Sequence, residues 1–402
     1  MENTVRHDYK IIGLIGLGHG TSHFFHLILP PLFPWIKLEF GLSNAELGLL
    51  MTAFFVVSGL GQILAGFVVD RFGAVSSIIA GLGLSGIASI GFSLSDTYGS
   101  LLVCAAIAGL GNSVFHPADY SLLNKKVNPA RLGHAYSVHG ISGALGWAAA
   151  PIFLVGFATL FDWRTAVAMS AIVAFVVLAT LFINLRSEEI SDRSKFKFEN
   201  QKAQPGLAFL KLKCIWMCFG FFLISALAFG GIQSFAPLAI GEVYAVPHTL
   251  AIGGVTAYMI SSAVGLFFGG FLASGKYPHD KIIGVSLSIA GLTAIFLSFG
   301  FLGGWSVIPL MAVIGFGAGL VGPSRDLLVR SATPKGATGR VYGVVYSGLD
   351  VGIALAPPIF GLVMDLHHPA WILIMIGIFQ ITAIAAAIGV KQQGVANVAT
   401  AS

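Results

Sequence analysis

Charged residues are scarce in this sequence: only 10% of its 402 residues are Asp, Glu, Lys or Arg, against about 25% in soluble globular domains. Apolar residues make up 56% of the chain and recur in windows near the ~20 residues that cross a bilayer. This balance excludes a soluble protein and predicts an all-α integral membrane protein. Twelve windows are expected to be transmembrane helices: 11–36, 46–69, 74–95, 99–123, 133–157, 164–185, 214–240, 250–273, 280–301, 304–329, 340–364 and 369–390.

Cysteine is also rare, with three residues in the whole chain, Cys104, Cys214 and Cys218. All three fall in apolar windows, and an odd number at membrane depth argues against a disulfide framework. We interpret them as small buried hydrophobes; the alternative is a metal pair at Cys214 and Cys218, one turn apart, although no histidine or third cysteine lies nearby in sequence. The first window is too long for a signal peptide and lacks a small-residue cleavage site, so we interpret it as the first transmembrane helix.

A concentrated basic patch is missing as well. The net charge is +5, but the Lys and Arg residues lie between the apolar windows, so nucleic acid is not an expected partner. With an internal N-terminus nearly all of them fall on the cytoplasmic side, and only Lys37 and Arg164 fall outside. The positive-inside rule then predicts cytoplasmic termini. We expect a monomer in the lipid bilayer of a bacterial inner membrane.

The second half of the chain repeats the first. A shift of 206 positions aligns GLGNSVFHPADYSLL (109–123) with GFGAGLVGPSRDLLV (315–329), and most matches are Gly or Pro. Such residues set bends and close helix approach, so the repeat predicts two bundles of one shape. We expect parallel six-helix bundles over 1–190 and 211–402, joined by a cytoplasmic linker over 191–210, an arrangement suited to two halves that rock about a central site.

A short motif follows the second window, GFVVDRFG at 66–73. It resembles the cytoplasmic loop signature of the major facilitator superfamily, although Ala74 replaces the usual basic residue and Ser274 stands at the acid position of the second half. The resemblance implies a transporter in which this motif is a conformational latch, with the acid facing a helix N-terminus of the other half. The alternative is an ordinary tight charged turn. The matching residues are Gly66, Asp70, Arg71 and Gly73.

Two further stretches bear on the subfamily. VFHPADY (114–120) is similar to the fourth span of fosmidomycin-resistance-type exporters, in which a Phe-His-Pro triplet recurs. GISGALGWAAAP (140–151) is loosely similar to the glycine-rich antiporter signature of exporters, although Ala150 replaces the glycine that commonly precedes its proline. These resemblances imply efflux in preference to uptake.

Histidines gather in the first window, in HGTSHFFH at 19–26. At 100° per residue, His19, His23 and His26 fall within about 60° of one another, opposite an apolar face. We expect them to line a substrate or proton path; the alternatives are hydrogen bonding between helices and a metal site. The site prediction includes no metal and no cofactor.

Polar residues in later windows extend the predicted path. Asn112, His116 and Asp119 are spaced by four and three, which places them on one face of a helix. Arg325 stands at the repeat position of Asp119, so one hypothesis is that these opposite charges bridge the halves; gate or interhelix salt bridges are the alternative to substrate contact. The other candidates are His139, Asp326, Tyr346 and Asp350.

These features predict a secondary active transporter that moves a small organic solute by alternating access, with proton-coupled efflux. No GxxxxGK[ST] loop is present, which removes the usual basis for ATP drive. The first alternative is organic-anion uptake or exchange, with Arg325 holding the anion. A distant alternative is a His-dependent intramembrane metalloenzyme, but no HExxH motif occurs, so an enzyme is not expected.

Overall fold

The structure is a computed structural model that describes residues 2–42, 44–199, 207–334 and 336–399. Within these ranges twelve helical stretches are long and apolar enough to span a bilayer, and they follow the twelve predicted windows in order. We number them as spans one to twelve. The prediction of an all-α fold with twelve transmembrane helices is confirmed.

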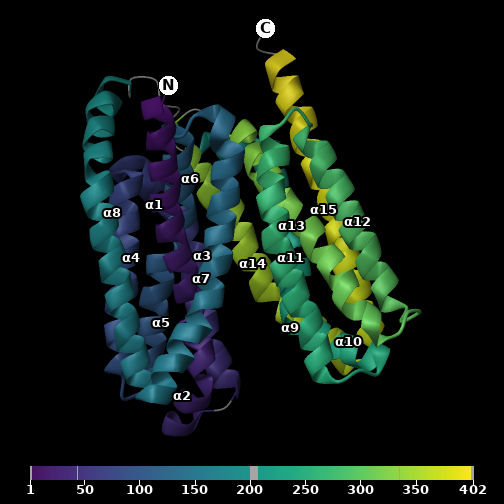
Figure 1. Ribbon diagram of the computed structural model, residues 1–402. Helices are drawn as coiled ribbons and strands as arrows, with labels where there is room; N and C mark the ends of the chain where they lie inside the picture. Colours follow the sequence, from purple (N-terminus) through teal and green to yellow (C-terminus); the bar gives the residue numbers. More distant parts are fainter. Residues whose placement is uncertain (1, 43, 200–206, 335, 400–402) are drawn as a thin grey trace. The chain divides into compact units, whose positions relative to one another are not determined.

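Spans one to six are formed by α1 to α8, and spans seven to twelve by α9 to α15 (Figure 1). The first group consists of α1 (Glu2–His26), η1 (Pro30–Leu32), α2 (Phe33–Phe40), α3 (Asn44–Phe72), α4 (Ala74–Ser93), α5 (Tyr98–Asn112), α6 (Phe115–Lys126), η2 (Pro129–Arg131), α7 (Leu132–Leu160) and α8 (Trp163–Glu199). The second consists of η4 (Ala208–Lys211), α9 (Lys213–Ser234), α10 (Ala236–Tyr244), α11 (His248–Ser274), α12 (His279–Ser298), η5 (Gly304–Ser306), α13 (Val307–Ala332), α14 (Thr338–Asp365) and α15 (Pro369–Ala399).

The two groups pair their helices in the same way. α3 packs on α5 as α11 packs on α13, and α4 packs on α8 as α12 packs on α15. Glycines of the repeat allow these close approaches: a Cβ at Gly109 would overlap the carbonyl oxygen of Phe54, and one at Gly315 would overlap that of Tyr258. The internal repeat read from the sequence is therefore present in the helix packing.

The chain forms two compact units. Unit 1 comprises Met1–Asn128, Ile141–Gly206 and Pro334–Val344, and unit 2 comprises Pro129–Gly140, Leu207–Thr333 and Val345–Ser402. The first part of α14 thus packs within unit 1, and the first part of α7 within unit 2. Each unit has its own apolar core, with Phe25 and Trp163 in the first and Met311 and Phe360 in the second.

The expected linker over 191–210 falls only partly within the described ranges. α8 continues through Glu199, η4 begins at Ala208, and residues 200–206 lie outside the described residues. The division into domains at this linker stays a prediction.

The first span is a broken helix and differs from the continuous one predicted over 11–36. α1 ends at His26, a 3₁₀ turn follows at Pro30–Leu32, and α2 completes the span. A proline ring clashes with the carbonyl group four residues earlier, which for Pro30 belongs to His26. The helix therefore ends directly after its third histidine.

The fourth span also breaks close to a proline. The helix is interrupted between Asn112 and Phe115, and the ring of Pro117 opposes the carbonyl group of Ser113, four residues before it. The equivalent Pro323 lies inside the continuous α13. The continuous helix expected over 99–123 is corrected, since Asn112 ends α5 whereas His116 and Asp119 belong to α6.

Candidate functional site

Four imidazole side chains lie together inside unit 1, and we call them the histidine cluster: His19, His23 and His26 of α1 and His116 of α6. The ring centroids of His19 and His23 are 4.3 Å apart, and that of His116 lies 5.4 Å from His19 and 6.2 Å from His23. His19 and His26 are buried. The face that the sequence predicts on α1 therefore points into the unit.

A carboxylate adjoins the histidine cluster. Nδ1 of His19 lies 3.2 Å from Oδ2 of Asp119, and both side chains are almost fully buried. A charge at membrane depth is costly unless it is paired, so a buried Asp119 gains from a protonated His19 beside it. Uptake or release of one proton by this pair would change the net charge buried inside unit 1.

His26 differs from His19 because both of its nitrogens have neutral partners. The indole N–H of Trp147 donates to Nδ1 at 3.3 Å, and Nε2 lies 2.9 Å from Oδ1 of Asn112. Nδ2 of Asn112 in turn donates to the hydroxyl of Ser58 at 2.8 Å. An indole is a donor only, so Nδ1 of His26 accepts and Nε2 carries the proton. This chain of hydrogen bonds holds His26 as a neutral imidazole.

His116 is oriented by α3. Its Nδ1 lies 2.8 Å from Oε1 of Gln62. With the amide oxygen as the acceptor, Nδ1 carries the proton of the neutral ring and Nε2 has the lone pair. Gln62 thus sets which nitrogen of His116 faces the remainder of the cluster.

α7 approaches the cluster through glycine. A Cβ at Gly143 would lie 2.6 Å from Nδ1 of His23 and 3.1 Å from Nε2 of His19. One turn further, a Cβ at Gly146 would overlap the carbonyl oxygen of Gly20. The two glycines allow α7 to lie against α1 without displacing the imidazole rings.

Unit 2 contains a second polar group, which we call the arginine group: Arg325, Asp326 and Tyr346. Nε and Nη2 of Arg325 lie 2.8 and 3.3 Å from the two carboxylate oxygens of Asp326, and the Tyr346 hydroxyl donates to Oδ1 at 2.8 Å. The guanidinium carbon lies 4.4 Å from the centre of the Phe222 ring, which adds a cation–π contact. Asp326 and Tyr346 are buried, whereas the Arg325 side chain is partly exposed.

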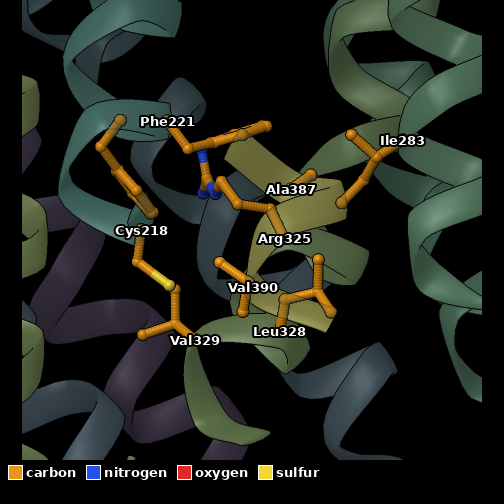
Figure 2. A pocket seen from close by; sticks show the side chains of 9 residues that line it. Cys218, Phe221, Ile283, Arg325, Leu328, Val329, Ala387 and Val390 are labelled. Atoms are coloured by element: carbon orange, nitrogen blue, oxygen red, sulfur yellow. The ribbon is translucent and has the colours of Figure 1, made fainter. Parts of the chain in front are cut away.

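A small pocket borders the arginine group. Figure 2 shows Arg325 among Cys218, Phe221 and Val329, with side chains of α12 and α15 completing the lining. The cavity volume is about 10 Å³, room for about one water molecule, and apart from Arg325 its lining side chains are apolar. This pocket as it stands does not accommodate an organic solute.

The loop motif lies against the first turn of α14, within unit 1. Oδ1 of Asp70 accepts from the Gly339 N–H at 3.1 Å, and Oδ2 accepts from Nε of Arg340 at 2.8 Å and from its backbone N–H at 3.3 Å. A Cβ at Gly66 would lie 2.7 Å from Cα of Arg340, so only glycine allows this approach. A carboxylate at a helix N-terminus is stabilised by the N–H groups there and by the helix dipole.

The other two motif residues lie at the turn itself. Gly73 has φ of 100° and directly precedes α4, a backbone conformation that favours glycine. Arg71 is exposed, with its guanidinium carbon 5.3 Å from the centre of the Phe72 ring. The backbone therefore favours glycine at both positions, because Gly66 lies close to α14 and Gly73 has a positive φ.

The structure brings most predicted site residues into groups. The histidine cluster gathers Asn112 and Asp119 around it, and the arginine group joins three residues of spans ten and eleven. His139 on α7 and Asp350 on α14 are buried side chains of unit 2. Sequence reasoning missed four neighbours of the cluster, Ser58, Gln62, Gly143 and Trp147. The spacing of Ser58 and Gln62 by four in an apolar span was the available signal.

Comparison with known proteins decides the family. A family model described as Major Facilitator Superfamily matches residues 15–357 and 254–396. The chain belongs to this superfamily. The resemblance drawn from the loop motif is therefore confirmed. The chain is a multi-pass membrane protein with twelve candidate spans among its described residues. Membership in this family of transporters points to transport and not to an enzyme.

Three relatives are similar at low identity. The fosmidomycin resistance protein of Escherichia coli is 27% identical over 180 residues, which is 44% of either chain. The hexose-6-phosphate:phosphate antiporter of Salmonella typhimurium is 27% identical over 363 residues, 80% of this chain and 78% of the antiporter. A probable nitrate/nitrite transporter of Mycobacterium tuberculosis is 25% identical over 359 residues, 84% and 85% of the two chains.

Proposed function

We propose that this superfamily member exports a small organic solute in exchange for protons, by alternating access. The observation that carries this proposal is the His19–Asp119 pair, two titratable side chains 3.2 Å apart that are almost fully buried on spans one and four. An unperturbed imidazole titrates near pH 6.5, within the physiological range. The pair can therefore take up a proton in one conformational state and release it in the other.

The contacts of Asp70 support the alternating part of the proposal. Its carboxylate has three hydrogen bonds to the first turn of α14, two of them to the charged Arg340 residue, and charge-assisted bonds are among the strong ones. We propose that this contact is a latch that forms in one state and opens in the other, with Gly66, Arg71 and Gly73 shaping the turn.

The remaining polar residues are proposed to contact the solute. His139, Asp350 and the arginine group are buried or partly buried in unit 2, and a guanidinium beside aromatic rings suits an anionic or aromatic solute. His26 and Asn112 are proposed to support the path by holding the shape of the cluster, because their hydrogen bonds fix a neutral ring.

Organic-anion exchange is the second candidate. It is favoured by Arg325 and by the similarity to an antiporter whose printed substrates, hexose 6-phosphate and phosphate, are anions. In this alternative the guanidinium holds the anion and proton uptake at His19 is not required.

The setting of the transporter is part of the same proposal. We propose that the chain acts as a monomer in a bacterial inner membrane, with both termini cytoplasmic. The positive-inside bias of the loops supports this orientation.

The test is flux through the purified protein in liposomes. Solutes are first selected by thermal stabilisation, since a ligand at 100 times its dissociation constant adds about 2.7 kcal/mol. Solute movement that follows an imposed pH gradient, and is lost in Asp119→Asn, supports proton-coupled transport. Strict anion-for-anion exchange that ignores the pH gradient rejects it and supports the second candidate.

A further inference from the structure

We propose that the histidine cluster binds a first-row transition-metal dication, with Zn²⁺ as the reference ion, through one ring nitrogen each of His19, His23 and His116. One ring nitrogen of each lies within 4.8 Å of those of the other two. Zinc bonds imidazole nitrogen at about 2.0–2.1 Å, so side-chain movements on the order of 1 Å bring the three nitrogens to bonding distance. This inference concerns binding by the chain itself and does not depend on the proposed transport.

The surroundings of two of these ligands match those of metal-bound histidines. A ligating histidine almost always donates its second ring N–H to a carboxylate or carbonyl oxygen, which fixes the tautomer and the ring. His19 has Asp119 at Nδ1, and His116 has the amide oxygen of Gln62 at Nδ1. In the neutral form of both rings Nδ1 then carries the proton. The Nε2 lone pair, which a metal ion needs, is directed away from these partners.

His26 is excluded from the set by the same reasoning. Its Nδ1 accepts from Trp147 and its Nε2 faces Asn112, so neither nitrogen is presented to the other imidazoles. The three proposed ligands come from two helices, with His19 and His23 one turn apart on α1 and His116 on α6. A fourth tetrahedral position is left for water or another oxygen ligand.

Gly143 supplies the space for the site. A side chain at this position would press on Nδ1 of His23 and lie close to Nε2 of His19. Asp119 supplies part of the charge balance, because its carboxylate offsets one of the two positive charges that the ion brings into the unit. The sequence analysis gave a metal site as one alternative for the histidines of α1, and the convergence of three rings, two of them with an outer partner, supports it.

The experiment is a titration of the purified full chain with Zn²⁺. The protein is prepared with an affinity tag that lacks histidine, stripped with a chelator and measured by isothermal titration calorimetry. The expected result is one Zn²⁺ per chain, lost in His19→Gln, His23→Gln and His116→Gln. Replacing an outer partner typically costs 10–100-fold in affinity, so Gln62→Met should weaken binding by about that factor and each ligand variant by more.

Two controls separate this site from chance binding. His26→Gln lies on the same helix outside the ligand set, and its amide can still accept from Trp147 and donate to Asn112, so the affinity should stay within about threefold. The exposed neighbours His367 and His368 are replaced together by Gln to remove a surface site, and the stoichiometry should stay unchanged. Loss of Zn²⁺ in this double variant would assign the ion to the surface and overturn the proposal.

A readout on the wild type keeps the test valid if a variant does not fold. X-ray absorption of the zinc-loaded protein should show three imidazole ligands. One imidazole or none, or binding that survives in the triple variant, would overturn the site. Solute flux measured with chelator present tests the proposed transport separately, so failure of one proposal is distinguishable from failure of the other.

Discussion

Spans four and ten are equivalent in the repeat, yet they differ in charge and in backbone. Span four breaks before Pro117 and contains Asp119, which lies beside His19 in unit 1. Span ten continues through Pro323 and contains Arg325, which is paired with its neighbour in unit 2. The glycines that bring helices together, such as Gly109 and Gly315, recur in both copies, whereas the charged residues at the Asp119 position do not. The two copies thus share their helix packing but differ in the chemistry of these spans.

The two loop contacts differ in the same way. In unit 1, Asp70 holds the first turn of α14 with a charged side chain. In unit 2 the equivalent end of α11 has Ser274, which lies against Gly133 of α7, and the nearby Ser137 hydroxyl donates to the Leu266 carbonyl at 2.6 Å. Only the first contact gains the energy of charge-assisted hydrogen bonds, so we expect the two to contribute unequally to switching.

The largest expected effect comes from neutralising the two equivalent charges. Asp119→Asn retains a hydrogen-bonding side chain beside His19 but loses the charge, so transport driven by a pH gradient should fall by at least about tenfold. Solute exchange without net proton movement should persist. Arg325→Gln should lower gradient-driven transport and solute exchange alike, each by about tenfold, because it removes a proposed solute contact. Paired liposome assays of gradient-driven flux and of exchange check this division.

His26→Gln is the matched control for Asp119→Asn. Its ring is held neutral by Trp147 and Asn112, and an amide can still donate and accept, so both activities should stay within about threefold. If both charge variants lose gradient-driven flux and exchange alike, the division of roles between the units is wrong.

The fold was predictable because its signals are local. Apolar windows gave the twelve spans, and Gly and Pro matches gave the repeat. The breaks after His26 and Asn112 also have a local cause in Pro30 and Pro117, although the apolar windows alone run through them.

The partners of the polar residues were less predictable. Symmetry suggests that Asp119 and Arg325 pair, but each has a partner in its own unit, His19 and Asp326. These contacts depend on how helices distant in sequence rotate and pack, which neither periodicity nor repeat spacing determines. The spacing of Ser58 and Gln62 indicates a polar face on span two, but nothing in the sequence assigns Gln62 or Trp147 to a particular histidine.

The latch contact is the next largest effect. Asp70→Asn removes the charge that faces Arg340, and we expect transport to slow several-fold with normal expression, because one state loses about 1.5–3 kcal/mol of charged hydrogen bonding. The state that loses stability is the one in which α14 contacts α3. Because the proposed orientation places this contact on the cytoplasmic side, cysteine labelling should show a shift to the inward-open form. Ser274→Ala is the control in unit 2 and should leave flux nearly unchanged. Equal slowing of flux in Asp70→Asn and Ser274→Ala would contradict the expected difference between the two loop contacts.

The helix break in span four can be tested against span ten. Pro117→Ala restores an N–H that can bond the Ser113 carbonyl, so α5 and α6 should become more continuous and amide exchange over 113–117 should slow. Pro323→Ala should change exchange over 319–323 little, because α13 is already continuous there. Hydrogen-exchange mass spectrometry measures both. Slower exchange in the span ten peptide alone would contradict the explanation of the break.

The smallest expected effect concerns the helix starts of spans six and twelve. Asp162 precedes α8, and its carboxylate accepts from the Thr165 N–H at 2.7 Å and from the Thr165 hydroxyl at 2.9 Å. These bonds from the backbone and side chain of Thr165 hold the pKa of the Asp162 carboxyl below its usual value. At the equivalent place before α15 stands His368, which is not among the favoured N-cap residues.

Asp162→Ala should therefore cost about 1 kcal/mol of stability, whereas His368→Ala should stay within about 0.5 kcal/mol. Because folding lowers the pKa of Asp162, its stabilisation is present above the unfolded value of about 3.9 and disappears as the pH falls through the lower folded value. The difference in thermal midpoint between wild type and Asp162→Ala in detergent should thus be full at pH 7 and shrink below about pH 4. A difference that stays constant down to pH 3 would mean that the carboxylate does not act as a charged cap, and the two helix starts would then be equivalent.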